Sequence, residues 1–212
     1  MSLSVVVLAG GTGKRLGERK AFTRLAGKPL LAHTLQAAQR ISTDLTLVVE
    51  PQDAARPELG ELDLEVRQLS DLEPGLGPLM GLYSALRVLP HDYVLALPCD
   101  TPFLSPRLLA HLVSLRGGWD AVVPRWRNGY LEPLHSVYRV EAARLAAEKA
   151  LGEGERRLQA LVSRLDRVRF VPVEDLEGLD PGLRSFWNIN HRGELEEAEA
   201  MLRRGGLPAR RV

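Results

Sequence analysis

The chain has 212 residues, 45% apolar and 26% charged, which suits one globular domain with a sizeable core and disfavours intrinsic disorder. Its 28 lysines and arginines balance 27 aspartates and glutamates, which argues against a nucleic-acid protein held by a large basic field, and a single cysteine excludes a disulfide framework and a multi-cysteine zinc site. No apolar run approaches the ~20 residues of a membrane span, and the N-terminus lacks the basic start of a signal peptide, so we expect a cytoplasmic protein that binds neither membrane nor nucleic acid.

Strands and helices are predicted to alternate along the chain. The apolar run over 4–8, followed by glycines, indicates a buried parallel strand, and a helix is predicted over 29–41, where apolar residues recur at helical spacing. Ser105 as N-cap and Pro106 at the first helical position predict a helix that ends near 116. Further strands are predicted over 45–49, 64–69, 93–97, 120–124 and 168–173. Further helices are predicted over 79–89, 140–151, 155–165 and 192–204.

This order of elements predicts an α/β fold. Repeated strand–helix units imply an open, mostly parallel sheet with helices on both faces. The segment 125–138 interrupts the order with Gly129, Pro133 and aromatic residues, so we expect an excursion there with an antiparallel strand near 134–138. We assign 1–204 to a single domain and expect a frayed tail over 205–212.

A glycine-rich loop with four cations follows the first strand and reads LAGGTGKRLGERK over 8–20. Glycines let backbone N–H groups approach phosphate oxygens, and the carboxyl end of a parallel strand is where α/β sheets bind nucleotides. The alternative is a tight strand-to-helix connection with solvated charges. The number of glycines and cations favours phosphate binding. Both common phosphate motifs are absent, because the dinucleotide fingerprint needs a glycine at 16 and the Walker A loop a glycine at 8.

The pattern AGG at 9–11, RLG at 15–17 and Lys20 resembles the nucleotidyltransferases that activate phosphorylated molecules with an NTP, and most of all the molybdenum cofactor guanylyltransferases of the MobA family. The resemblance implies a Rossmann-like three-layer nucleotidyltransferase fold. It places Arg15 and Lys20 on the triphosphate. The family usually carries an aspartate where this chain has Arg19. Backbone contacts to the nucleotide are expected from Leu8, Ala9, Gly10 and Gly11.

Asp71, followed by GLGPLMG over 75–81, is similar to the family's aspartate and G-P-L-x-G stretch near guanine and ribose. The resemblance places Asp71 on the nucleoside, although an ordinary loop before a helix explains the same residues equally well. The family often has an asparagine shortly after the second strand, where this chain reads VEPQD over 49–53. Gln52 could substitute for it, so the choice between GTP and CTP stays open.

Asp100 follows the predicted strand 93–97 in the stretch ALPCDTPF. A carboxylate just beyond a buried strand points into the crevice where ligands sit, and Mg²⁺ prefers oxygen ligands. We therefore predict Asp100 as a nucleotide-binding and catalytic residue that holds Mg²⁺. The alternative is a residue that caps the turn before the Ser105 helix. Cys99 is interpreted as a small buried filler and not a nucleophile.

Two later segments extend the resemblance over nearly the whole chain. EPLHSVY over 132–138 resembles the family's stretch at the edge of the acceptor site, whereas His135 by itself indicates a structural histidine. FWNIN over 186–190 resembles the family's N-I-N motif. Alternate residues of a strand share a face, so Asn188 and Asn190 are predicted to bind the acceptor or the metal.

The resemblance implies transfer of GMP from GTP to the terminal phosphate of Mo-molybdopterin, with Mg²⁺ as cofactor and release of pyrophosphate. It also implies transient contact with cofactor-biosynthesis or molybdoenzyme-maturation proteins. The predicted catalytic residues are Arg15, Lys20 and Asp100. Two alternatives stay open: a cytidylyltransferase of the same cofactor or an enzyme for a sugar or isoprenoid phosphate, and a non-catalytic nucleotide-binding domain. The retained Lys20 and Asp100 favour an enzyme.

Overall fold

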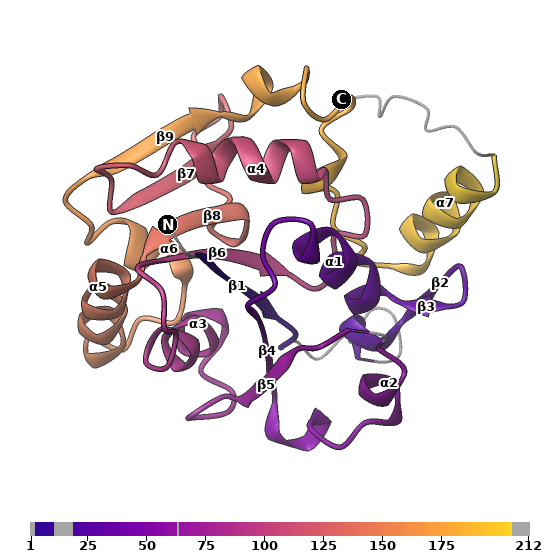
Figure 1. Ribbon diagram of the computed structural model, residues 1–212, viewed down its shortest axis with the longest axis horizontal. Helices are drawn as coiled ribbons and strands as arrows, with labels where there is room; N and C mark the ends of the chain where they lie inside the picture. Colours follow the sequence, from indigo (N-terminus) through magenta and orange to yellow (C-terminus); the bar gives the residue numbers. More distant parts are fainter. Residues whose placement is uncertain (1–2, 11–18, 63, 205–212) are drawn as a thin grey trace.

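The computed structural model describes residues 3–10, 19–62 and 64–204, and within them a seven-stranded sheet forms the centre of the molecule (Figure 1). The strand order is β5-β4-β1-β6-β8-β7-β9. Strand β8 is antiparallel to β6 and β7, and the other neighbouring pairs of this sheet are parallel. The strands are β1 (Leu3–Leu8), β4 (Leu45–Val49), β5 (Arg67–Ser70), β6 (Tyr93–Pro98), β7 (Ala121–Arg125), β8 (Ser136–Arg139) and β9 (Val168–Pro172).

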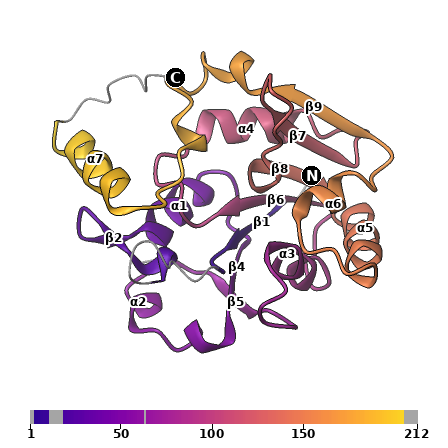
Figure 2. The same ribbon diagram turned by 180° about the vertical axis from the view of Figure 1, so that it is seen from behind.

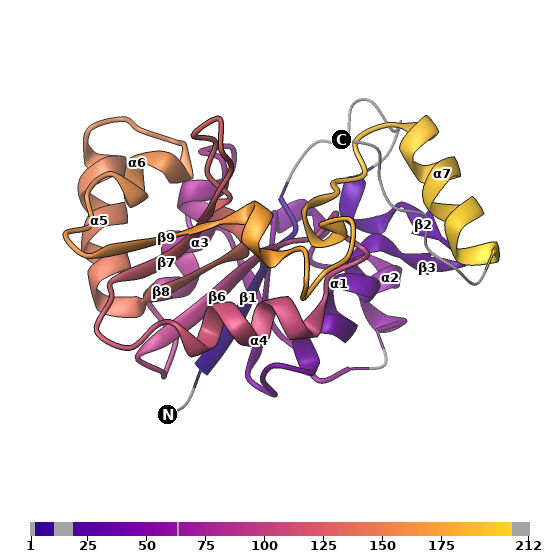
Figure 3. The ribbon, with the colours of Figure 1, turned by 90° about the horizontal axis from the view of Figure 1, so that it is seen from above.

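Helices cover both faces of the sheet, as Figure 3 shows from above. The α-helices of the described residues are α1 (Leu30–Gln39), α2 (Pro57–Gly60), α3 (Pro78–Leu86), α4 (Pro106–Ser114), α5 (Val140–Gly152), α6 (Leu158–Val162) and α7 (Arg192–Arg203). Short 3₁₀ helices span Lys20–Phe22, Pro51–Asp53, Pro133–His135, Val173–Leu176 and Arg184–Phe186. The result is a three-layer α/β/α arrangement, which confirms the predicted fold class.

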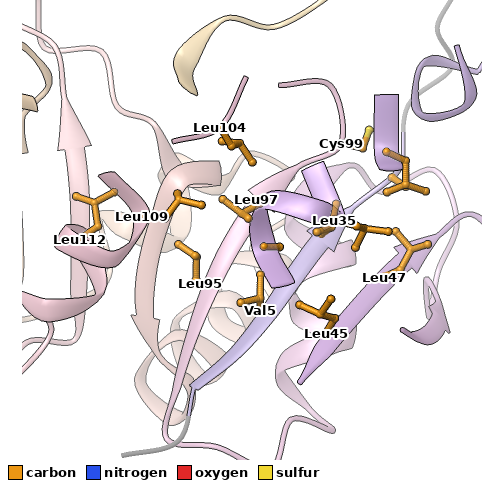
Figure 4. Close-up of a cluster of buried hydrophobic side chains, with 14 of the residues drawn as sticks. Val5, Leu35, Leu45, Leu47, Leu95, Leu97, Cys99, Leu104, Leu109 and Leu112 are labelled. Carbon is orange, nitrogen blue, oxygen red and sulfur yellow. The ribbon is translucent and has the colours of Figure 1, made fainter. Parts of the chain in front are cut away.

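The alternation of side chains along β1 builds the two apolar layers. Val5 and Val7 belong to the cluster under α1 and α4, where Leu35 and Leu109 contribute (Figure 4). Val6 and Leu8, one position out of step, belong to the cluster under α3, α5 and α6. Because both faces of the strand are buried, β1 reads as a continuous apolar run.

The last helix, α7, packs against a two-stranded ribbon that lies beside the main sheet (Figure 2). Strands β2 (Arg24–Leu25) and β3 (Lys28–Pro29) are joined by a turn in which Ala26 and Gly27 have φ of 49° and 82°. Leu25 of this ribbon and Met201 of α7 share a third apolar cluster with Trp187 and Ile189. This packing ties the segment before α7 to the rest of the molecule.

Most predicted elements are confirmed. The strand over 45–49 has the predicted bounds, and the strand over 4–8 begins one residue earlier. The start of α4 follows the predicted chemistry, because Ser105 Oγ accepts a hydrogen bond from the Leu108 N–H at 3.4 Å and Pro106 is the first helical residue. The antiparallel strand of the excursion is also present, as β8. Among the described residues, no helix combines the length and the apolar character needed to cross a membrane.

Several predicted bounds are wrong; the helix expected over 79–89, for example, is α3, which ends at Leu86. The helix expected over 155–165 is α6, Leu158–Val162. The strand expected over 64–69 begins at Arg67, and the antiparallel strand expected near 134 begins at Ser136, because Pro133–His135 forms a 3₁₀ helix. The small ribbon was not predicted. The single-domain assignment over 1–204 stays a prediction, and the tail 205–212 lies outside the described residues.

Candidate active site

A cleft of about 860 Å³ opens at the carboxyl edge of the sheet. Its walls come from the ends of β1, β4 and β6, from the start of α3, and from segments near 130–135, 157–159 and 188–190. Residues predicted from distant parts of the sequence meet here. The cleft is lined by seven of them: Leu8, Gly10, Lys20, Asp71, Asp100, Asn188 and Asn190.

Lys20, Asp100 and Asn190 form the polar centre of the cleft. Lys20 Nζ donates to Asp100 Oδ2 at 2.5 Å and to Asn190 Oδ1 at 2.7 Å. The side chain of Lys20 is 23% exposed and that of Asp100 12%. A charge pair this sheltered from water attracts more strongly than a surface pair. The predicted cation and the predicted metal ligand therefore lie side by side.

Main-chain contacts fix Asp100 and the Asn188–Asn190 segment against each other. The Ile189 N–H donates to the Asp100 carbonyl at 2.9 Å. The Asn190 N–H donates to Glu194 Oε2 at 2.6 Å, within the capping box of α7 that His191 and Glu194 form. The amide of Asn190 thus has a defined position opposite Lys20.

Cys99, immediately before Asp100, belongs to the apolar cluster under α1 and α4. Burial raises the pKa of its thiol far above the ordinary value, so the thiolate needed for nucleophilic attack does not form at neutral pH. The structure agrees with the interpretation of Cys99 as a filler.

Asp71 occupies the side of the cleft formed by β4 and β5. Burial, and secondly the negative charge of Glu50, raise the pKa of Asp71 to about 6. Within the described residues, Asp71 Oδ1 is buried without a hydrogen-bond partner. An unsatisfied buried acceptor is unfavourable, and a ligand N–H would relieve it. A Cβ added at Gly81 would approach this oxygen to 3.1 Å, so glycine leaves it room.

Arg19, which stands where the family usually has an aspartate, points toward the loop after β4. Its Nη1 donates to Glu50 Oε2 at 2.8 Å, and its Nε lies 3.4 Å from Asp53 Oδ2. Glu50 lines the cleft, and Gln52 Nε2 donates to it at 2.5 Å. The two departures from the family pattern, at 19 and at 49–53, are therefore in direct contact. The orientation of Lys20 comes from Asp100 and Asn190.

The opposite side of the cleft is formed by residues after β7. Glu132 accepts a hydrogen bond from Trp126 Nε1 at 2.8 Å. Burial raises the pKa of Glu132, the Trp126 hydrogen bond opposes this, and the charge of Asp100 adds to the rise. Burial also lowers the pKa of His135 to about 3, so its ring is neutral at pH 7, and it packs 4.9 Å from the Phe186 ring. His135 lines the cleft as a neutral group.

Not every predicted site residue reaches the cleft. The Ala9 N–H donates to the Val48 carbonyl at 2.8 Å as part of the sheet, and the lining includes Leu8 and Gly10 but not Ala9. Gly11 and Arg15 lie outside the described residues.

The residues that line the cleft and that sequence reasoning missed include Glu50, Tyr130, Arg157 and Gln159. The position of Glu50 directly after a buried strand, like that of Asp100, is a signal that could have indicated it. Tyr130 and Arg157 lie in irregular segments without a comparable signal. Arg157 brings a further cation to the cleft from the N-cap of α6.

The oxygen groups at the centre fit a hard divalent cation. Within the described residues, no three His, Cys, Asp or Glu side chains gather as a ready metal cage. Mg²⁺ does not need one, because it keeps waters and substrate phosphates in its shell and uses one or two carboxylates. Asp100 offers a carboxylate for such a cation, and Asn188 and Asn190 line the same cleft with amide groups.

Comparison with known proteins gives a consistent result. The model of the MobA-like NTP transferase domain matches residues 5–168. A probable molybdenum cofactor guanylyltransferase of Methanothermobacter thermautotrophicus is 34% identical over 196 residues, which cover 91% of this chain and 96% of the relative. A molybdenum cofactor guanylyltransferase of Desulfosudis oleivorans is 32% identical over 204 residues, with 95% and 96% covered.

Solved structures show the same similarity. The crystal structure of molybdopterin-guanine dinucleotide biosynthesis protein A from Archaeoglobus fulgidus matches with a TM-score of 0.80 and 30% identity over 95% of this chain and 99% of that one. The 2-C-methyl-D-erythritol 4-phosphate cytidylyltransferase of Thermus thermophilus matches with a TM-score of 0.67 at 21% identity, over 96% and 100% of the two chains, and shares the fold.

Proposed function

The chain belongs to the MobA-like NTP transferase family, and from that membership we propose that it transfers GMP from GTP to the terminal phosphate of Mo-molybdopterin and releases pyrophosphate. The observation that carries the proposal is the contact between Lys20 and Asp100 at the centre of the cleft. It joins a phosphate-binding cation to a metal-binding carboxylate at the carboxyl edge of the sheet.

The reaction has to overcome repulsion between an anionic nucleophile and an anionic triphosphate. The second pKa of a phosphate monoester is about 6, so the acceptor is already ionised at neutral pH and needs little help from a general base. Catalysis then consists of positioning both substrates in line and neutralising charge. A cleft with cations, amides and a carboxylate suits this chemistry.

Each side chain has a proposed role. Lys20 binds the triphosphate and the charge that develops on the leaving pyrophosphate, and Arg15 is proposed to share this role. Asp100 holds a divalent cation, which we propose to be Mg²⁺, and Asn188 and Asn190 bind the acceptor or the same cation. When bound, the cation supplies positive charge beside the phosphates.

Base selection is proposed to depend on Asp71. Guanine presents the N1–H and N2–H donors, and Asp71 Oδ1 is an acceptor that lacks a partner within the described residues. Cytosine offers one donor group on its pairing edge, so two acceptors in this region favour guanine. Glu50, which also lines this side, supplies a second carboxylate.

The test compares four nucleotides and then adds the acceptor. Melting curves are recorded with GTP, CTP, UTP or ATP and Mg²⁺, and we expect a rise in melting temperature that is specific for GTP. Release of pyrophosphate is then measured with GTP, Mg²⁺ and Mo-molybdopterin. A rise specific for CTP would support the cytidylyltransferase alternative. GTP binding without pyrophosphate release would support the non-catalytic alternative.

The proposed substrates also indicate where the protein acts. GTP and the labile pterin are used where molybdoenzymes mature, so we propose a cytoplasmic location and transient contact with cofactor-biosynthesis or molybdoenzyme-maturation proteins.

A further inference from the structure

A small hairpin between β7 and β8 stands at the rim of the cleft and is seen after β7 at the top of Figure 3. Its backbone is closed by a bridge between Arg125 and Leu131 and by a hydrogen bond from the Trp126 N–H to the Tyr130 carbonyl at 2.9 Å. At its turn, Gly129 has a φ of 86°, and Asn128 Oδ1 accepts from the Tyr130 N–H at 2.9 Å.

The hairpin is anchored to the body of the protein on both sides of its turn. Trp126 Nε1 donates to Glu132, and the Trp126 ring lies edge-on to Phe186 with the ring centres 5.7 Å apart. The guanidinium of Arg125 lies 4.6 Å from the centre of the Phe170 ring. The Arg127 N–H donates to Glu174 Oε1 at 3.1 Å. These contacts hold the backbone at Tyr130 in one place.

The ring of Tyr130 is the exception on this anchored hairpin. Tyr130 is 58% exposed, the largest value among the exposed large apolar residues of the described chain. Its side chain makes no hydrogen bond and no ring contact with another described residue. Nevertheless, Tyr130 lines the cleft that contains Lys20 and Asp100. An aromatic ring held in position but left uncovered is suited to stack on a flat ligand.

The strand order determines which substrate this ring can meet. Asp71 and Glu50 follow β5 and β4, Asp100 follows β6, and Tyr130 follows β7. Four strand spacings separate β4 from β7, roughly 19 Å at ~4.8 Å each. A nucleobase bound beside Asp71 therefore does not reach Tyr130. The ring lies on the far side of Asp100 from the nucleoside, where the acceptor of the transferred nucleotide has to enter.

We propose that Tyr130 is the stacking platform for the flat heterocyclic ring system of the acceptor, the pterin, and thereby selects the acceptor. The inference rests on the proposed function, since that function supplies a pterin as acceptor. Gln159 also lines the cleft, and its amide can both donate to and accept from the polar edge of such a ring. Stacking leaves GTP binding unaffected, because the two ligands occupy opposite sides of Asp100.

The experiment compares Tyr130→Ala and Tyr130→Leu with Tyr130→Phe in the full chain. Melting temperature and circular dichroism establish that each variant folds. KM is measured separately for GTP and for Mo-molybdopterin, and in parallel the fluorescence of 6-hydroxymethylpterin is titrated with each protein. Removal of one aromatic stacking partner weakens binding by about 5- to 100-fold. We expect that rise in KM for the acceptor with Tyr130→Ala and Tyr130→Leu, an unchanged KM for GTP, and near wild-type values with Tyr130→Phe.

Four outcomes decide the inference. An unchanged acceptor KM in Tyr130→Ala overturns it while the proposed function stands. A loss in Tyr130→Phe as large as in Tyr130→Ala also overturns it, because the hydroxyl would then be the important group. If the wild type transfers no nucleotide, the proposed function fails, and the pterin titration then decides whether Tyr130 is a stacking platform. Quenching that is kept in Tyr130→Phe and lost in Tyr130→Ala would support the platform, and equal titrations of all the proteins would overturn it.

Discussion

Lys20 Nζ lies 2.5 Å from Asp100 Oδ2, although 80 positions separate the two residues in the chain. Asp100 follows the carboxyl end of β6, the parallel neighbour of β1, and the 3₁₀ helix Lys20–Phe22 places Lys20 at the same edge of the sheet. In the absence of substrates the two charges neutralise each other. On the proposed function, we expect a bound triphosphate and its cation to replace this contact, because each offers its partner a charge of opposite sign.

Replacement of Asp100 by Asn keeps the size of the side chain and removes its charge. We expect turnover to fall by about 100-fold or more, the scale found when one electrostatic group is removed from an active site. The fold should persist, because Lys20 keeps Asn190 as a partner. Pyrophosphate release under saturating GTP measures the effect. Asp175→Asn, an equal change of charge at an exposed position outside the cleft lining, is the control. A near-normal rate in Asp100→Asn removes this residue from the mechanism.

Lys20→Ala is expected to weaken GTP binding by about 10- to 100-fold, because a charge-assisted hydrogen bond contributes about 1.5–3 kcal/mol. Isothermal titration with GTP and Mg²⁺ measures the dissociation constant. Lys28→Ala removes an exposed lysine outside the cleft lining and should leave it unchanged. An unaltered affinity in Lys20→Ala would contradict the role in triphosphate binding.

The raised pKa of Asp71 predicts how stability depends on pH. The pKa of Asp71 in the folded protein is about 6, against an ordinary value of 3.8 for an aspartate, so the folded state binds the proton more tightly than the unfolded state. The contribution of Asp71 to stability therefore decreases as pH rises from 3.8 to about 6, and its unfavourable effect is complete above that range.

Asp71→Asn removes this dependence. Without ligand, the gain in stability of the variant over the wild type, measured as the difference in the free energy of unfolding, should be larger at pH 7.5 than at pH 4.5. Urea unfolding of both proteins at the two pH values gives the comparison. The variant should at the same time bind GTP less tightly at pH 7.5, since an acceptor for guanine is lost. If the stability difference between variant and wild type is the same at both pH values, the pKa of Asp71 is not raised.

Gly81→Ala separates nucleotide binding from stability. The added Cβ would lie 3.1 Å from Asp71 Oδ1 and 3.6 Å from Leu8 Cδ2, so the carboxylate has to move. Alanine is favoured over glycine within a helix by about 1 kcal/mol, which offsets the crowding in α3. We expect a small change in melting temperature and a several-fold weaker affinity for GTP. Gly152→Ala in α5, where the Cβ meets nothing within 4 Å, should leave GTP affinity unchanged.

The bounds of an element were predicted best where its capping residues or its continuous burial mark its ends. The strand over 45–49 is buried at every position, so its apolar run has sharp ends. The start of α4 has both a capping serine and a proline at the first helical position. By contrast, β5 lies at the edge of the sheet with exposed or partly exposed residues, and its polar pattern did not reveal where it starts.

The candidate site was predicted where one residue type carries the chemistry, although only Asp100 directly follows a strand and the segment 187–190, expected as a strand, is irregular. Lys20, Asp100 and Asn190 are the clearest cases, and the structure brings all three into contact. Tyr130 and Arg157 were missed, because an irregular segment has no periodic pattern from which to predict whether a side chain points into the cleft or away from it. The Arg19–Glu50 contact was missed for another reason: it is a pairing between segments 31 positions apart, which a single sequence does not specify.

The reversed direction of β8 has a consequence for how enzymes of this architecture can diversify. Because β8 returns through the sheet between β6 and β7, the hairpin that precedes it projects from the rim and lies outside the parallel strands β1 and β6, beyond which Lys20 and Asp100 lie. Its length and side chains can change without disturbing the buried layers. If the proposed roles hold, a change confined to this hairpin would alter the choice of acceptor and leave the nucleotide-binding residues in place.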